Sequence, residues 1–158
     1  MIIEILIGQN NKTLKQKSLP VKHIDASVRN LIGQMKKAME QNNGVGLAAI
    51  QIGEPIRIIV CEIDNKSYTF INPEIIKFSP ETSIAEEGCL SLPNIYGEVE
   101  RSEKITLKAV NFEGKRIKTK AYGLLARVIQ HETDHLDGIL FIDKAKNITE
   151  QIGKRSAL

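Results

Sequence analysis

The sequence is poor in several features that mark particular classes of protein. It contains no tryptophan, aromatic residues make up 4% of it, and its net charge is only +3. A dedicated nucleic-acid module would carry a denser basic stripe and more aromatic side chains. We therefore do not expect nucleic acid to be the main partner, and DNA is excluded from the expected partners. The charge permits no more than a weak contact with RNA.

The sequence also lacks a recognisable membrane or targeting segment. The apolar stretch at residues 1–8 is interrupted by Glu4, has no basic residues before it and is followed by polar residues. A signal peptide or a membrane span needs a longer apolar run, and a transit peptide is rich in Arg and Ser. These absences predict a cytoplasmic protein with no membrane partner, and a bacterial cytoplasm is the simplest location.

Cysteine is scarce as well, and the two cysteines have different surroundings. In a cytoplasmic protein disulfides are rare, so each thiol is interpreted separately. Cys61 lies in a run of β-branched residues at 58–63, which is typical of a small buried side chain in a strand. Cys89 lies beside a glycine in the segment Glu-Gly-Cys-Leu-Ser at 87–91.

The length and composition of the chain predict a single folded domain. The 158 residues are 42% hydrophobic and 26% charged, which is ordinary for a globular protein with a packed core. No internal repeat, low-complexity tract or Pro/Ser-rich linker marks a boundary. We therefore expect one catalytic domain spanning residues 1–158.

Two helices can be predicted from apolar spacing. The first is long and amphipathic, with Asp25 as a cap and Asn43-Gly44 as a stop, and its apolar positions are Ile24, Val28, Leu31, Ile32, Met35 and Met39. The second runs from Gly123 to Asp137 and ends at Gly138. Apolar residues occur on most of its sides, so we expect this helix to be largely buried.

Hairpin patterns complete the prediction of the fold class. Residues 57–63 and 68–72 are rich in strand formers and flank a short turn, and residues 104–110 and 116–122 flank a second turn that contains Gly114. Helices mixed with hairpins, without repeated strand–helix–strand units, indicate an α+β domain built on antiparallel sheet.

The second predicted helix carries the motif His131-Glu132-Thr133-Asp134-His135. A spacing of four residues places the two imidazoles one turn apart on one face, where they can hold one metal ion. Glu132 then lies beside the metal and can take a proton from water. A catalytic centre usually has three protein ligands, and Cys89 is a better candidate for the third than His23, which lies far from other ligand-like residues.

A third segment, residues 44–51, reads Gly-Val-Gly-Leu-Ala-Ala-Ile-Gln. It is neither a dinucleotide-binding loop nor a Walker loop, because the required glycine and lysine positions are absent. One interpretation is a plain connection from helix to strand. The other is a backbone that pairs with an extended peptide, with Gln51 as an amide donor.

These three motifs together resemble the signature motifs of the peptide deformylase family, in the same order. The resemblance covers nearly the whole chain, including residues 14–21 and 135–141. It implies antiparallel β-sheets that surround a central metal-bearing helix, with the long amphipathic helix towards the N-terminus. It also implies a ferrous ion held by Cys89, His131 and His135, although Zn²⁺, Ni²⁺ and Co²⁺ suit these donors equally.

The resemblance implies an activity and roles for further residues. The activity is removal of the N-formyl group from formyl-methionine at the N-terminus of nascent polypeptides, by water activated at the metal. Glu132 matches the general acid/base, and Gln51 and the backbone amide of Leu90 match the oxyanion donors. The residues that match substrate contacts are Val45, Gly46, Glu87, Leu124 and Val128. A transient contact between the tail after Ile142 and the ribosome is left open.

Two positions depart from some members of the family. The sequence also allows two other functions. Tyr96 stands where some bacterial members have Arg, and Arg127 replaces an apolar residue and is expected at the rim of the substrate pocket. A zinc peptidase would need a third ligand downstream, where Glu150 is the available glutamate. A non-catalytic module with a structural metal would need neither Glu132 nor Gln51.

Overall fold

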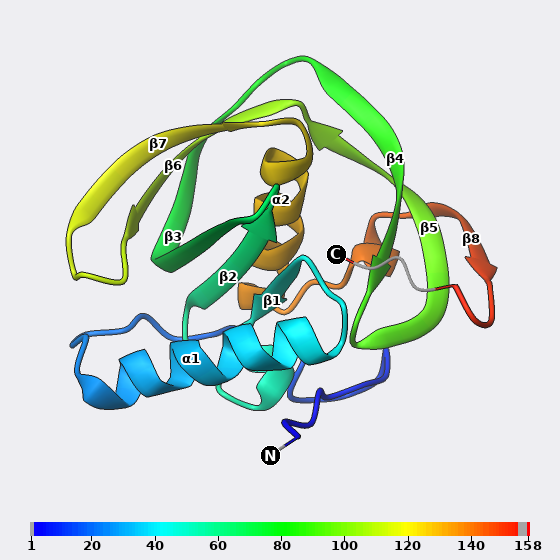
Figure 1. Cartoon of the computed structure of the whole chain (residues 1–158). Coiled ribbons are helices and arrows are strands. Elements are labelled where there is room, and N and C mark those ends of the chain that lie inside the picture. The colour runs from blue at the N-terminus through cyan, green and yellow to red at the C-terminus, as the bar shows by residue number, and fades with distance from the viewer. Residues whose placement is uncertain (1, 155–157) are drawn as a thin grey trace.

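Two antiparallel β-sheets surround one buried helix in the computed structural model, which describes residues 2–154 and 158 (Figure 1). In chain order the elements are α1 (Ala26–Gln41), β1 (Gly46–Ala48), the 3₁₀ helix η1 (Ala49–Ile52), β2 (Ile58–Ile63), β3 (Lys66–Phe78), β4 (Thr82–Cys89), β5 (Leu92–Ser102), β6 (Lys104–Val110), β7 (Arg116–Tyr122), α2 (Gly123–Leu136), the 3₁₀ helix η2 (Phe141–Asp143) and β8 (Lys146–Glu150). The predicted α+β class is confirmed, with α2 as the central helix.

The strands form one five-stranded and one three-stranded sheet. The larger sheet has the order β1-β2-β3-β6-β7 and the smaller has the order β4-β5-β8, with antiparallel pairing throughout. Strands β1 and β4 are therefore both edge strands, each with one side free of strand partners within the described residues. Figure 1 shows these two edges on the same side of α2.

The two helices pack on opposite faces of the larger sheet. Alternate residues of β2 show this, because successive side chains of a strand point to opposite faces. Ile58 and Val60 belong to the apolar cluster that contains Met35 of α1, whereas Ile59 and Cys61 belong to the cluster that contains Val128 of α2. Since residues 58–61 of β2 are buried on both faces, they form a continuous apolar run, which ends at the exposed Glu62.

Both predicted hairpins are present. Strands β6 and β7 pair from Lys104 opposite Tyr122 to Val110 opposite Arg116, within the predicted bounds. Strands β2 and β3 are joined at Asp64 and Asn65, whose φ angles of 52° and 63° suit a tight hairpin turn. Strand β3 continues to Phe78, beyond the expected end at residue 72, because it pairs with β6 from Ile71 onward through two register shifts.

Each predicted helix begins and ends close to its signals. The Asp25 carboxylate accepts a hydrogen bond of 3.0 Å from the amide of Val28, as an N-cap does. Helix α2 ends at Leu136, and Gly138 follows with a φ of 75°, directly against the backbone of Lys15. A Cβ at this position would collide with that backbone, so the chain needs glycine here.

Four strands were not predicted from the sequence. These are β1, which lies in the segment interpreted as a connection or a peptide-binding backbone, the hairpin partner strands β4 and β5, and β8. All five residues of β8 are exposed, so its sequence has no apolar alternation to mark it. Within the described residues, neither helix has the length and apolar character needed to cross a membrane.

Candidate metal centre

The fold brings Cys89, His131 and His135 together. Cys89 is the last residue of β4, and the two histidines lie one turn apart on α2. One ligand atom from each residue lies within 4.8 Å of the others, and the Cys89 Sγ lies 3.3 Å from His135 Nε2. All three side chains are buried. The sequence thus folds into a compact set of one thiol and two imidazoles.

The unpaired polar atoms around this set fit a bound metal ion. His131 Nε2 and both carboxylate oxygens of Glu132 are buried without a hydrogen-bond partner among the described residues. Buried polar atoms in proteins nearly always have a partner, so these atoms indicate a bound ion or water at the site. Thiolate and imidazole donors suit transition metals such as iron, zinc, cobalt and nickel. The site therefore has suitable ligand atoms for such an ion.

Glu132 lies beside the ligands and is fully buried. Its Oε1 is 4.0 Å from His131 Nε2. Burial, the largest influence, raises the pKa of Glu132 to about 7, although the nearby His131 acts in the opposite direction. A carboxyl group that titrates near neutral pH can both accept and donate a proton.

The Gln51 side chain is oriented towards the same site. Its Oε1 accepts a hydrogen bond of 2.9 Å from the amide of Ala48, which leaves the NH₂ group to face the ligands. That nitrogen donates to Ser91 Oγ at 3.1 Å and lies 3.6 Å from Cys89 Sγ. Leu90 follows Cys89 directly, in the turn between β4 and β5, so its backbone amide is adjacent to the thiol.

The N-terminal segment forms hydrogen bonds with the motifs at residues 44–51 and 87–91. The amide of Leu6 donates to the Gln51 carbonyl at 2.8 Å, and the amide of Gly8 donates to the Ser91 carbonyl at 2.9 Å. The segments around Gln51 and Ser91, which are forty residues apart in the sequence, therefore both bind to the N-terminal segment. The side chains of Gln51 and Cys89 depend on this tie for their relative positions.

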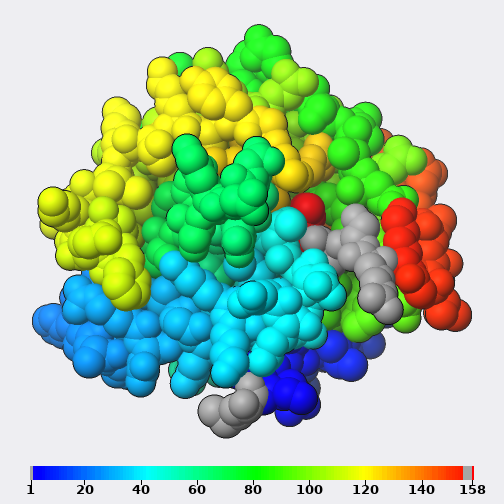
Figure 2. All heavy atoms as spheres, in the orientation of Figure 1, coloured from blue at the N-terminus to red at the C-terminus, as the bar shows by residue number. Residues whose placement is uncertain are grey.

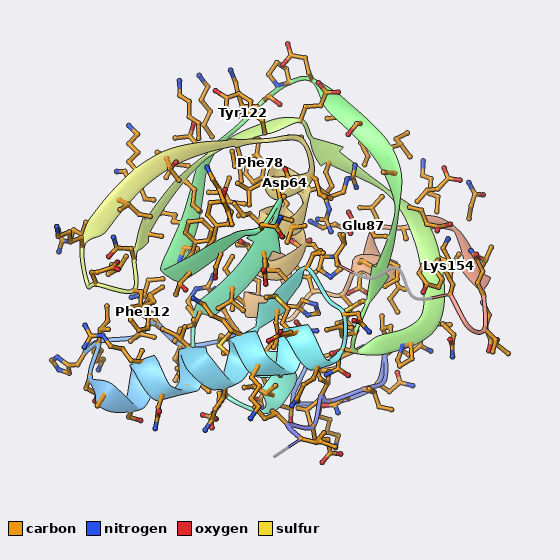
Figure 3. All side chains as sticks on the ribbon, viewed as in Figure 1. Asp64, Phe78, Glu87, Phe112, Tyr122 and Lys154 are labelled. Atoms are coloured by element: carbon orange, nitrogen blue, oxygen red, sulfur yellow. The ribbon has the colours of Figure 1, made fainter. Side chains whose placement is uncertain are left out.

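Glu87, which was expected to line the substrate pocket, lies on β4 (Figure 3), and its carboxylate contacts the ligand His131. Its Oε1 lies 2.9 Å from His131 Nδ1, while its two oxygens receive hydrogen bonds of 3.0 Å from Arg101. Burial alone would raise the pKa of Glu87, but the hydrogen bonds from His131 and Arg101 outweigh it and lower the pKa to about 2. An ionised carboxylate that accepts from Nδ1 leaves Nε2 free to bind a metal.

The structure also corrects the expectation for Arg127, which is buried and does not lie at the rim of a pocket. Its guanidinium donates to Glu87 Oε2 at 2.7 Å, to the Val99 carbonyl at 2.9 Å and to the Ser83 carbonyl at 2.9 Å. It precedes His131 by one helical turn, so both side chains reach the same carboxylate from one face of α2. Arg127 thus joins α2 to β4 and β5.

Asp134 and Arg101 extend this network to the surface. Arg101 donates to Asp134 at 2.6 Å, and Asp134 also pairs with Lys144 at 3.0 Å. The sequence left open whether Asp134 supports the metal ligands or is an exposed acid, and the structure shows it paired with Arg101. No motif pointed to Arg101, although its place in a strand that follows the Glu-Gly-Cys segment could have suggested a partner for Glu87.

The residues that match substrate contacts lie on β1, on the loop before it and on α2. A Cβ at Gly46 would lie 2.7 Å from Val128 Cγ1 and 2.8 Å from Glu132 Oε1, so only glycine allows the strand to approach α2 this closely. Val45 is half-buried against the same apolar cluster. Leu124 is one turn before Val128 and is 52% exposed. Val45 and Val128 thus share one apolar cluster, whereas Leu124 lies exposed at the start of α2.

A cavity of about 340 Å³ opens beside Cys89 and Leu90. Tyr96 lies on its wall, and the Tyr96 hydroxyl donates to the carbonyl of Lys154 at 2.9 Å. The Lys154 ammonium lies 4.7 Å from the centre of the Tyr96 ring. The tyrosine at this position therefore holds the segment before the C-terminus against the cleft.

The remaining candidates of the sequence lie elsewhere. His23 is exposed and is not part of the ligand group, and Glu150 is an exposed residue of β8 that pairs with Ile95. Neither can supply the third ligand of a peptidase-type site. Cys61 is buried in β2 as predicted, and burial raises the pKa of its thiol.

Comparisons with known proteins agree with this geometry. The family model described as polypeptide deformylase matches residues 3–151. A peptide deformylase of Dictyoglomus turgidum is 48% identical over 92% of this chain and 94% of its own. The crystal structure of the enzyme of that name from Thermotoga maritima superposes with a TM-score of 0.89, at 40% identity over 92% of this chain and 99% of the other. A Met-Ala-Ser-bound peptide deformylase from Acinetobacter baumannii gives 0.88, at 32% identity over 91% and 98%.

Proposed function

This chain belongs to the polypeptide deformylase family, and from that premise we propose how its residues remove the N-formyl group from nascent peptides. It is a metal-dependent hydrolase that acts on a formyl amide and releases formate. The observation that carries the proposed roles is the set of Cys89, His131 and His135, with the unpaired carboxylate of Glu132 beside it.

The metal site supports hydrolysis by water. Cys89, His131 and His135 would hold a metal ion, which would supply a Lewis acid able to polarise the formyl carbonyl and to lower the pKa of water. Glu132 accepts the proton of the attacking water, because its carboxylate faces the ligands and has no other partner. The water oxygen bonds to the formyl carbon, the C–N bond breaks, and Glu132 returns the proton to the leaving amine. Formate and a free N-terminus are the products.

Gln51 and Leu90 stabilise the oxyanion in this proposal. The Gln51 NH₂ group faces the thiol because its oxygen is held by Ala48. The amide of Leu90 lies next to Cys89 in the chain. Two fixed donors aimed at the developing negative charge lower the barrier more than mobile water does, because they need no reorganisation.

The substrate peptide enters between the two free sheet edges. Strands β1 and β4 both end their sheets, and Gly46 of β1 and Cys89 of β4 both reach the site. An extended peptide can add to such an edge through backbone hydrogen bonds. Val45, Leu124 and Val128 would receive the methionine side chain, since an unbranched thioether fits an irregular apolar slot. The Met-Ala-Ser-bound relative supports this class of ligand.

Glu87 acts in this proposal through His131 and not by touching the substrate. Its carboxylate is saturated by Arg101, Arg127 and His131, which leaves it no donor or acceptor to offer a ligand. By accepting from His131 Nδ1 it fixes the tautomer whose Nε2 binds the metal. Arg127 and Arg101 keep that carboxylate ionised and in place.

The metal and the cellular setting are the finer parts of the proposal. We propose Fe²⁺ as the physiological ion on the strength of the family resemblance, with Zn²⁺, Ni²⁺ or Co²⁺ able to occupy the same donors in purified protein. The substrates are formyl-methionyl nascent chains in a bacterial cytoplasm. A transient contact with the ribosome would suit such substrates.

The decisive experiment measures formate release from formyl-Met-Ala-Ser by protein purified without oxygen, together with its metal content. The proposal expects about one metal ion per chain and release of formate that stops when the metal is removed by chelation and resumes when Fe²⁺ is restored. Acetyl-Met-Ala-Ser serves as a control for cleavage at the internal peptide bonds. Cleavage of internal bonds without formate release would contradict the proposal.

A further inference from the structure

Leu158 lies against β4 and an apolar cluster next to the metal ligands. Its backbone amide donates a hydrogen bond of 3.2 Å to the carbonyl of Gly88, the residue before the ligand Cys89. Its side chain is half-buried and packs against the apolar cluster that contains Val128. By contrast Ile152, six residues earlier, is 83% exposed. Figure 1 marks this end of the chain between β1 and β4, in agreement with both contacts.

The contact with Gly88 uses the free edge of the smaller sheet. Strand β4 pairs with β5 on one side, and on its other side the Gly88 carbonyl accepts from Leu158. This is the hydrogen bond that an added peptide strand would make with the same carbonyl. The leucine side chain packs against the apolar cluster that contains Val128, one of the residues that we assign to the substrate's methionine. Leu158 thus imitates both the backbone and the side chain of a bound peptide.

The segment before the C-terminus is anchored close enough to deliver the leucine. The amide of Gln151 donates to the Asn94 carbonyl at 2.8 Å, and the Lys154 carbonyl accepts from the Tyr96 hydroxyl. The Lys154 ammonium also pairs with Glu86 on β4. In Figure 2 the coloured residues at and after β8, drawn in red, lie against those drawn in green.

We propose that Leu158 is a built-in competitor of the substrate, which occupies the methionine slot and must leave before a formyl peptide can bind. This inference rests on the proposed function, because the slot is the one that we assign to the substrate. The competitor reduces the fraction of molecules that can bind peptide and therefore raises the apparent KM by the reciprocal of that fraction. It leaves kcat unchanged, since the leucine is absent from the enzyme–substrate complex.

The test compares Leu158→Ser with Ile152→Ser and the unaltered chain, using formyl-Met-Ala-Ser. Ile152 is a matched control, because it is an aliphatic residue of the same segment but is exposed. We expect Leu158→Ser to lower KM by about three- to ten-fold at constant kcat, which corresponds to a slot that is filled in most molecules. The Ile152→Ser protein should match the unaltered chain. An equal KM in all three proteins, or a higher KM in Leu158→Ser, would overturn the inference.

A second readout does not depend on turnover. In protein with ¹³C-labelled leucine methyl groups, the Leu158 signal is assigned from the Leu158→Ser spectrum, and the product Met-Ala-Ser is then added. Displacement should move that signal towards the position of an exposed leucine. A Leu158 signal that stays in place while the product binds would contradict the proposal. Absence of formate release from all three proteins would instead overturn the proposed function.

Discussion

The two helices of this protein bury different kinds of side chain. The buried residues of α1 are all apolar: Ile32, Met35, Ala38 and Met39. Helix α2 also buries apolar residues, but more than half of its buried positions are polar or charged: Arg127, Gln130, His131, Glu132 and His135. Polar groups cost free energy when they are taken out of water, so α2 pays this cost for a reason that α1 does not have.

The hydrogen-bond partners of these residues show why α2 buries polar side chains. Arg127 and Gln130 are saturated by hydrogen bonds to β4, β5 and the backbone, and they hold the helix in place. Glu132 and the Nε2 of His131 have no partner in the described part of the chain. The difference separates residues that support the site from those that act in it. It also predicts that changes in α1 affect stability and changes in this face of α2 affect chemistry.

The largest effect is expected for Glu132→Gln, which keeps the size of the side chain but removes the base. The kcat should fall by about a hundred- to ten-thousand-fold, the usual worth of general acid–base catalysis. The metal content and the thermal midpoint should stay close to those of the unaltered protein, since the carboxylate has no hydrogen-bond partner in the described residues. A metal-loaded mutant with nearly normal kcat would break the distinction between the helices and the proposed mechanism with it.

Met35→Ala tests the opposite side of the comparison. Met35 is fully buried between α1 and the larger sheet, so its truncation should lower the free energy of unfolding by roughly 2–5 kcal/mol. Deformylation measured per folded, metal-loaded molecule should be unchanged. Denaturant titration and steady-state kinetics on the same sample check both statements, and a large loss of kcat without loss of stability would be inconsistent with a purely structural α1.

Glu87→Gln sharpens the comparison, because Glu87 supports a ligand without being one. Gln keeps an acceptor for His131 Nδ1 but loses the charge that Arg101 and Arg127 surround. We expect the affinity for Co²⁺, followed by its visible spectrum, to fall by about ten- to a hundred-fold. Glu86→Gln, at the exposed neighbouring position, is the control and should leave the affinity unaltered. Unchanged Co²⁺ binding in Glu87→Gln would contradict the role assigned to this residue.

The smallest effect is expected at the start of α1. Asp25→Ala removes the cap of the Val28 amide and should cost roughly 0.5–2 kcal/mol of stability. Neither metal binding nor kcat should change. Asp25→Asn, which retains a capping oxygen, should recover most of the loss in thermal unfolding. If Asn and Ala were equally destabilising, the cap would not explain the effect.

The sequence predicted the elements whose local pattern matches their environment. Helix α1 shows apolar residues at helical spacing with a cap, and the β6–β7 hairpin has strand formers around a glycine turn. Strand β8 was missed because its side chains are all exposed, and only pairing with β5 makes it a strand. The length of β3 was missed because its second half pairs with β6, far along the chain.

The metal ligands could be predicted because short sequence motifs mark them. The residues whose positions depend on the packing of distant elements could not be predicted. His131 and His135 share a helix face by spacing alone, and Cys89 was chosen as a ligand from its motif. The burial of Arg127 and the position of Glu87 behind His131 depend on how α2 packs against β4 and β5. No local pattern records that packing. The placement of Leu158 at Gly88 likewise depends on contacts between distant residues.

Cys89 is the proposed metal ligand on which the mechanism depends most directly. The other cysteine of the chain, Cys61, provides a matched control for testing that role. Both are buried, but Cys61 lies in strand β2 within an apolar cluster, whereas Cys89 lies beside His135. Metal content should be measured on the purified Cys89→Ala and Cys61→Ala proteins. We expect Cys89→Ala to lose nearly all bound metal and Cys61→Ala to retain the content of the unaltered chain. Equal metal loss in the two proteins, or full retention in Cys89→Ala, would contradict the assignment.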